Sequence, residues 1–216
     1  MVPLSLLAHE LAHGMGAFLA DAECCEFAIQ QTKEGARCTT RMPPVALPDQ
    51  FSEVAAGPLL DLMLAGKLSP AADVGQAAEA LNVWMRGLQE AKIPSAMDSD
   101  AARAFRFGRC LDGAEAFSAL QCALTAAVLA HGAYKQHGAH LWLVAARLGT
   151  LRPEQALAFQ ANDIVNLLEH KRPLPLREVV LRDWLAGSEE RANEAMAVEA
   201  ELVAVQLDRG IIKWRT

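Results

Sequence analysis

The chain has little of what marks several common classes of protein. Its 216 residues carry 20 Lys and Arg against 26 Asp and Glu, a formal net charge of −6, and the basic residues are scattered rather than gathered in a stripe. A nucleic-acid-binding surface is therefore not expected. The expected partner is a protein or peptide substrate, and a homo-oligomer is compatible with this composition.

Cysteines are few and odd in number, at positions 24, 25, 38, 110 and 122, and no two of them form a C-x-x-C pair. This pattern favours a reducing compartment. The N-terminus has no basic start, and its apolar run is interrupted by His9, Glu10 and His13, so no export signal is expected. These absences together predict a cytoplasmic protein.

A long hydrophobic run is also missing. The longest uncharged run lies between Glu115 and His131. It has roughly fifteen residues, which is shorter than the roughly twenty that a helix needs to cross a bilayer. We expect a buried core helix there and no stable membrane insertion. With 52% hydrophobic residues, the chain has ample material for a core.

What the chain does contain is the sequence His9-Glu10-Leu11-Ala12-His13, an H-E-x-x-H motif. Residues i and i+4 lie one turn apart on the same face of a helix, so both imidazoles can bind one metal ion. Glu10, on the adjacent flank, can reach a water molecule at that metal. Burying two histidines and a carboxylate on an apolar helix is costly unless they have a partner. The motif therefore predicts a Zn²⁺ hydrolase site.

The rest of the chain predicts a mainly α fold with one small hairpin. A first helix is expected over 3–20, a hairpin over 23–40, and a rigid, non-helical connection through Pro43, Pro44 and Pro48. Helices are expected from Phe51, with a cap near Asp49, to Gly66, and from Ala71 to Ala91. Further helices are expected over 100–108, 112–134, 139–149, 153–170 and 175–207.

A catalytic zinc site needs a third protein ligand and an open position for water. Five acidic residues are candidates for that ligand: Glu23, Glu26, Glu53, Asp73 and Asp112. The first two lie in the expected hairpin, where the chain leaves the metal. Asp112 resembles the ligand of intramembrane site-2 proteases, which would require spanning helices. From the residues alone, Asp73 could equally be a carboxylate that stabilises the start of a helix.

Four segments occur in an order that resembles a known family. They are His9–His13, the hairpin Gly35…Thr39-Thr40…Pro43, the segment Ala56-Gly57-Pro58-Leu59-Leu60-Asp61-Leu62 closing on Gly66, and Ala71-Ala72-Asp73-Val74-Gly75-Gln76-Ala77. This succession resembles the protease domain of the FtsH family, peptidase family M41. In the family the last segment reads like A-x-x-D-x-x-x-A, and this chain resembles it from Asp73 to Ala77. The resemblance covers about residues 4–90 and implies that Asp73 is the third zinc ligand, with Glu10 as the catalytic base.

The chain departs from this family at Pro58 and Asp61, where Arg and Glu are usual, and we expect neither an AAA module nor a membrane anchor. The resemblance implies a zincin-like, M41-like metalloendopeptidase whose zinc-activated water attacks a peptide bond. Strand residues Cys38, Thr39, Thr40 and Arg41 are the expected substrate contacts, because an extended peptide can pair with an exposed strand.

The expected organisation is a peptidase core over residues 1–95 and a helical C-terminal part over 96–216, the two packed together or forming one continuous domain. A second function stays open at this point. A zincin-derived regulatory or protein-interaction module would keep the fold, and even the metal, without cutting.

Overall fold

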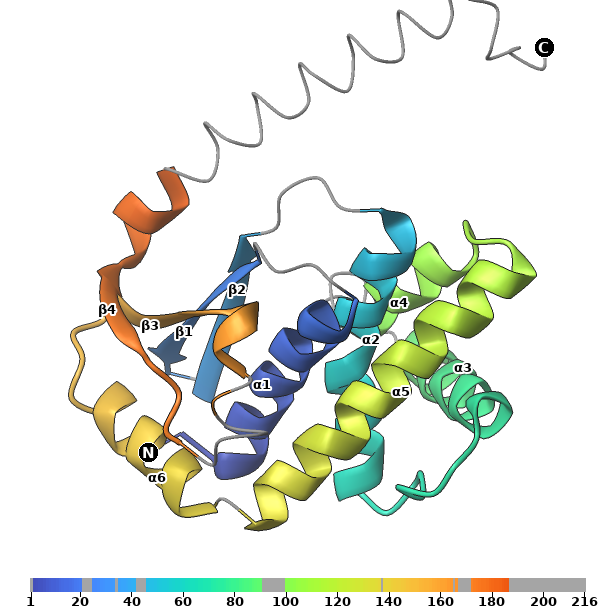
Figure 1. The fold of residues 1–216 in the computed structure, drawn as a ribbon, viewed down its shortest axis with the longest axis horizontal. Coiled ribbons are helices and arrows are strands. Elements are labelled where there is room, and N and C mark those ends of the chain that lie inside the picture. Colours follow the sequence, from blue (N-terminus) through green and yellow to red (C-terminus); the bar gives the residue numbers. More distant parts are fainter. Residues whose placement is uncertain are drawn as a thin grey trace, which may run out of the picture.

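The computed structural model describes residues 2–20, 25–33, 35–41, 46–90, 100–136, 138–164, 166 and 172–186. These residues form a mostly helical fold with one small antiparallel sheet (Figure 1). The helices are α1 (Leu4–Leu19), α2 (Leu47–Leu64), α3 (Val74–Glu90), α4 (Asp100–Gly108), α5 (Gly113–Gln136) and α6 (Gly138–Leu148). The strands are β1 (Glu26–Thr32), β2 (Gly35–Arg41), β3 (Gln155–Gln160) and β4 (Arg177–Val180).

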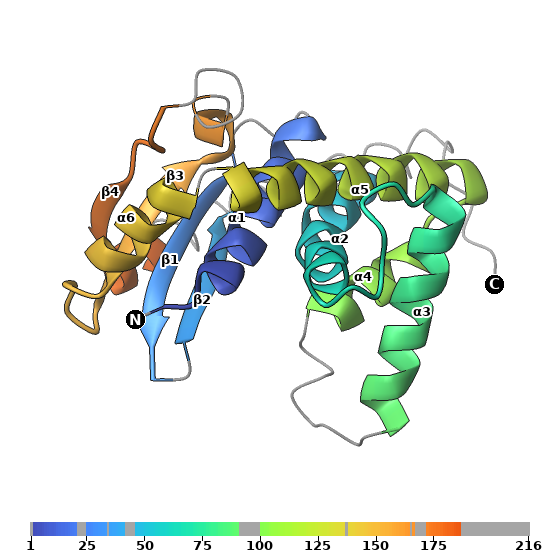
Figure 2. The same cartoon turned by 90° about the horizontal axis from the view of Figure 1, so that it is seen from below.

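Helix α1 lies at the centre of the fold. Figure 2 shows the sheet and α6 on one side of α1 and helices α2 and α4 on the other, with α5 running alongside both groups. An unbroken run from Leu11 to Ala17 is buried, because α1 is covered on several sides. A helix enclosed in this way can be apolar almost all round. Polar groups in residues 10–17 of α1 therefore lie in the protein interior.

The sheet has the strand order β2-β1-β3-β4, and every neighbouring pair is antiparallel. Hairpin β1–β2 has the expected position, with Ile29 opposite Cys38 and a turn that ends at Gly35 (φ 140°), a backbone conformation that favours glycine. Ile29 is also opposite Leu157 of β3. In the described part of the chain β2 pairs with a strand on one side only, so it forms an edge of the sheet.

Most of the expected helices are confirmed with small shifts of their ends. Helix α2 begins four residues before Phe51, with Ala46 rather than Asp49 at its N-cap. The expectation that Pro48 lies outside a helix is wrong, because proline fits the first helical turn, where its missing N–H has no partner to lose. Residues 42–45, with the other two prolines of that connection, lie outside the described residues.

The helices expected over 153–170 and 175–207 are confirmed only in part, since the described residues are helical at 161–164 and 181–186 but form strands before each of these short pieces. Residues 155–160 form β3 and residues 177–180 form β4. Ala156 to Phe159 are all buried, because β3 lies between β1 and β4 and is covered on both faces. A central strand of this kind shows no polar–apolar alternation, and its sequence cannot be told from a short buried helix by periodicity. Residues 187–207 lie outside the described part of the chain.

Residues on both sides of the expected boundary at 95/96 share one sheet and one hydrophobic core. Strand β3 comes from the second part of the chain and pairs with β1 from the first. Helix α5 likewise packs on α1 and α2. The described residues after position 100 thus help to complete the core that the first part of the chain begins.

Helix α5 is long and apolar enough, by length and composition alone, to cross a membrane. Half of its most apolar window is buried inside the protein, where it packs on α1 and α2. A core helix meets the same criterion. The expectation of no stable membrane insertion stays a prediction.

Replacing Gly16 by alanine should destabilise the protein by about 1–3 kcal/mol, the usual cost of overpacking. A Cβ at this position would lie 2.6 Å from the Ser52 carbonyl oxygen and 2.9 Å from the Glu53 Cα, so α1 and α2 would have to separate. Urea unfolding measures the change.

Gly87→Ala is the matched control, because a Cβ there meets nothing within 4 Å. It should stabilise α3 by about 0.5–1 kcal/mol, since glycine is unfavourable inside a helix. Equal effects of the two substitutions would show that the α1–α2 contact is not close.

Candidate metal centre

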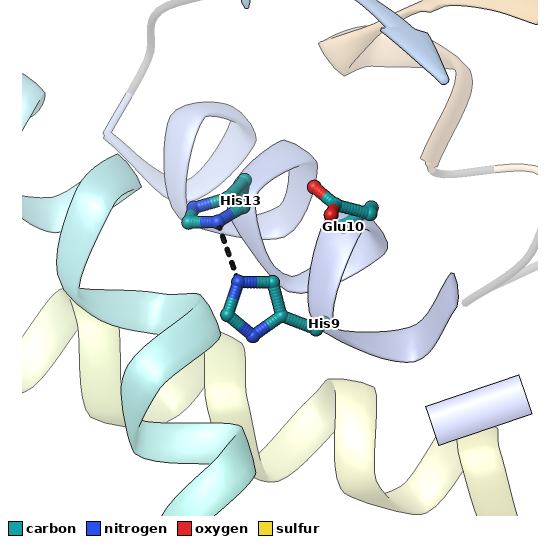
Figure 3. Close-up of side chains that lie close together, drawn as sticks. All are labelled: His9, Glu10 and His13. Carbon is teal, nitrogen blue, oxygen red and sulfur yellow. Dashed lines mark hydrogen bonds between the residues drawn. The ribbon is translucent and has the colours of Figure 1, made fainter. Parts of the chain in front are cut away.

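The two histidines and the glutamate of the H-E-x-x-H motif lie together on α1 (Figure 3). The Nε2 atoms of His9 and His13 are 3.2 Å apart, and Glu10 stands on the adjacent flank of the helix. The potential ligand atoms of these three residues all lie within 4.8 Å of one another. Glu10 and His13 are buried, at 6% and 4% exposure. The motif thus forms a compact polar cluster in the core.

A third potential ligand comes from the first residue of α4. Asp100 Oδ2 lies 3.5 Å from His9 Nε2 and 3.3 Å from His13 Nε2. With the 3.2 Å between the two nitrogens, these atoms form a nearly equilateral triangle. A tetrahedral zinc ion with bonds of about 2.0–2.2 Å holds its ligand atoms about 3.3–3.5 Å apart. The triangle therefore fits one face of a zinc coordination tetrahedron and leaves the fourth corner open.

The other ring nitrogen of each imidazole, Nδ1, also has a hydrogen-bond partner. His9 Nδ1 donates to Asp61 Oδ2 at 2.9 Å, and His13 Nδ1 donates to the Glu53 carbonyl oxygen at 2.9 Å. Both acceptors belong to α2. With a proton held at each Nδ1, a neutral imidazole directs the lone pair of its Nε2 toward the centre of the triangle. Outer partners of this kind orient metal-binding histidines in zinc proteins.

Arg103 holds the other oxygen of Asp100, since its Nη1 lies 3.4 Å from Oδ1. The guanidinium also lies 6.0 Å from the centre of the Phe107 ring. The two oxygens of Asp100 are therefore divided, with Oδ1 toward arginine and Oδ2 toward the imidazoles. Such a division orients the carboxylate for a single bond to a metal.

Gly57 lets α2 approach the site. A Cβ at this position would lie 2.7 Å from His13 Nε2 and 2.8 Å from His9 Cε1. Any side chain at residue 57 would therefore displace the imidazoles. The absence of a side chain at Gly57 thus allows close approach, and the backbone of α2 forms one wall of the site.

Asp73, the expected third ligand, is not brought to the histidines. It is exposed at the start of α3, where its Oδ1 accepts from the Gln76 N–H at 2.8 Å and its own N–H donates to Gln76 Oε1. This exchange is a capping box, which satisfies two backbone donors that the helix leaves without partners. The assignment from the family resemblance is therefore corrected, and Asp100 occupies the position beside His9 and His13.

The other candidates for the third ligand also lie elsewhere. Asp112 caps α5, accepting from the N–H groups of Ala114 and Glu115. Glu26 is on β1 and pairs with Arg177. Glu53 is near His13, but its Oε1 approaches Nδ1, at 3.7 Å, on the side of the ring that faces away from His9. Glu23 lies outside the described residues.

The sequence contains a signal that could have identified Asp100. The pattern D-x-x-x-A occurs at Asp73…Ala77 and again at Asp100…Ala104, and in both cases the aspartate is at or next to the start of a helix. The first copy comes next after the Gly57 segment, in the order that the family resemblance gives. Asp61, a position where the chain departs from the family, accepts a hydrogen bond from His9.

The expected substrate contacts Cys38 to Arg41 lie on β2, the edge of the described sheet. The Thr40 hydroxyl donates to Glu53 Oε1 at 3.3 Å, which places this strand next to the α2 wall of the site. Binding of a substrate to these residues stays a prediction.

The centre carries a surplus of negative charge. Four carboxylates surround the two imidazoles, those of Glu10, Glu53, Asp61 and Asp100. Burial would raise the pKa of Asp100, but hydrogen bonds from His13 and His9 hold it well below its ordinary range. Burial raises the pKa of Glu53, and His13 and Arg103 offset this only in part. Such a site is stabilised by bound protons or by a bound cation.

Comparison with models of known protein families, with curated proteins and with solved structures found no match to the chain. What the site does is therefore inferred from the chemistry and geometry of its side chains.

The metal-free protein should lose stability as the pH rises from 6.5 to about 10. Burial lowers the pKa of both histidines, but hydrogen bonds to Asp100, and to Asp61 for His9, outweigh it and raise the pKa of His9 to about 10 and that of His13 to about 9. Because the folded state binds these protons more tightly than the unfolded chain, their contribution is complete below pH 6.5. It is lost as the pH passes the two raised values.

Urea unfolding of chelator-treated protein across this pH range measures the loss. Asp100→Asn removes the partner that the two rings share, so it should flatten the dependence. A wild-type unfolding free energy that is constant or rises over this range would contradict the expectation.

Proposed function

We propose that the chain is a zinc-dependent metalloendopeptidase in which His9, His13 and Asp100 bind the metal and Glu10 is the general base. The observation that carries this proposal is the triangle of His9 Nε2, His13 Nε2 and Asp100 Oδ2, with sides of 3.2–3.5 Å. Two neutral imidazoles and one carboxylate with an open fourth position are the donor set of catalytic zinc sites.

The surrounding charges support a divalent cation. With neutral imidazoles, the carboxylates around the triangle outnumber the guanidinium of Arg103, the one cation that the described side chains place beside them. Burying such an excess of negative charge is costly unless a cation compensates it. Nitrogen and carboxylate donors suit zinc better than calcium or magnesium, which prefer oxygen ligands alone.

When bound, zinc would activate a water molecule and polarise a peptide carbonyl group. Glu10, beside the ligands on α1, would accept the proton of that water and deliver it to the leaving amine. Asp61 and the Glu53 carbonyl retain the Nδ1 protons of the two histidines. Arg103 keeps the second oxygen of Asp100 away from the reaction.

The family that this proposal favours is the M41-like zinc peptidases. The motif on α1, the hairpin β1–β2 and the Gly57 segment occur in the order of the FtsH protease domain, and Asp100…Ala104 supplies the D-x-x-x-A pattern beside the histidines. The substrates proposed are proteins or peptides in an extended conformation.

A non-cleaving interaction module is the alternative. Two large apolar side chains, Val83 on α3 and Phe117 on α5, are 58% and 57% exposed, although neither contributes to the metal centre. Exposed apolar groups of this size are common at protein interfaces. Measurement of cleavage decides between the two functions.

Asp100→Ala should lower zinc affinity by more than the roughly 10–100-fold that loss of an outer partner costs, because it removes a ligand. Asp73→Ala is the matched control and should leave the affinity unchanged, since Asp73 only caps α3. Competition with a chromophoric chelator measures both. The opposite order of effects would restore Asp73 as the ligand and overturn the proposed site.

Glu10→Gln should lower kcat for cleavage of an unfolded protein substrate by about 10²–10⁴-fold, the usual contribution of a general base. Zinc stoichiometry should not change, because Glu10 is not one of the three proposed ligands. Equal cleavage by wild type and variant, or no zinc-dependent cleavage by wild type, would rule out the peptidase and favour the interaction module.

A further inference from the structure

Glu53 is a buried carboxylate for which the proposed chemistry has no use. It is 2% exposed, in the middle of α2, and its neighbours Val54, Ala55 and Ala56 are fully buried. Carboxylates are rarely buried to this degree without a specific partner, because removing their charge from water is costly. The Glu53 carboxylate therefore calls for an explanation beyond helix packing.

The contacts of Glu53 join three elements of the fold. Its carbonyl oxygen accepts from His13 Nδ1 of α1, and its Oε1 lies 3.7 Å from the same nitrogen. The same Oε1 accepts from the Thr40 hydroxyl of β2 at 3.3 Å. One side chain therefore stands between a proposed metal ligand and the edge strand of the sheet.

Thr40 lies on β2, an edge strand of the described sheet, so its contact with Glu53 affects how that strand is placed. Thr40 pairs with Phe27 in the hairpin, next to the end of β2. In the described part of the chain the outer edge of β2 has no strand partner, so its backbone can accept an added strand. The register of such a strand against the metal depends on how β2 is held relative to α1. The Thr40–Glu53–His13 contacts are a direct connection between the two.

We propose that Glu53 is a positioning residue that ties edge strand β2, through the Thr40 hydroxyl, to His13, and so sets the register of an extended peptide substrate against the metal. This inference rests on the proposed peptidase function and adds the element that aligns the substrate. A misplacement of about 1 Å can cost about 10²-fold in rate, so a single hydrogen bond in this position has a large effect.

Thr40→Val tests the connection because it removes the hydroxyl and keeps the shape of the side chain. Zinc affinity should stay within about threefold of wild type, because the Glu53 carbonyl still holds His13, whereas kcat should fall about 10–100-fold. Thr40→Ser retains the hydroxyl and should restore kcat. Thr125→Val, the same substitution on the exposed side of α5, is the matched control and should change neither quantity.

Glu53→Met removes the acceptor oxygen and puts an apolar side chain of similar length in its place. Because both variants break the same connection, the double variant Thr40→Val/Glu53→Met should be no slower than the slower single variant. Three results would each overturn the positioning role. They are losses of kcat that multiply in the double variant, an unchanged kcat in Thr40→Val, and a loss of zinc in Thr40→Val.

Hydrogen exchange separates failure of this inference from failure of the proposed function. Zinc binding should slow amide exchange in Gly35–Arg41 by about fivefold or more in wild type and Thr40→Ser, and by much less in Thr40→Val. This readout needs no cleavage. Equal slowing in all three proteins would overturn the connection while leaving zinc binding and cleavage intact, whereas a wild type that binds no zinc would refute both proposals.

Discussion

Compensation of charge on the buried face of α1 is the constraint on which the rest of the structure depends. Glu10 and His13 are buried in the core of the fold and His9 is largely buried beside them, so water solvates these groups only in small part. Every polar atom there requires a partner from another element. Helix α2 supplies Asp61 and the Glu53 carbonyl, and α4 supplies Asp100. The polar motif therefore determines how three helices pack, as much as the apolar residues do.

Close approach of backbones makes this compensation geometrically feasible. Gly16 allows α1 to lie against the backbone of α2 at Ser52, and Gly57 allows α2 to lie against both imidazoles. Larger side chains at either position would move the acceptors on α2 beyond hydrogen-bond distance of the histidines. The same closeness brings Glu53 between His13 and Thr40, which is why the metal centre and the edge of the sheet can act as one unit.

The sequence predicts those parts of the fold whose signal is local. The helices now seen as α1 and α4 to α6 follow from periodicity and helix-start signals, and the hairpin follows from alternating residues around a Lys-Glu-Gly turn. Strand β3 could not be predicted in this way, because burial on both faces removes the alternation that marks a strand. Its pairing with β1, more than a hundred residues earlier, depends on contacts between residues far apart in the sequence.

At the metal centre the sequence by itself determined that His9, Glu10 and His13 share one side of a helix, because helical spacing is a property of the local backbone. It could not select the third ligand. Asp73 and Asp100 begin the same D-x-x-x-A pattern beside a helix start and are locally equivalent. Only the tertiary packing, which places α4 against α2 and leaves the start of α3 in solvent, brings Asp100 to the imidazoles and makes Asp73 a cap.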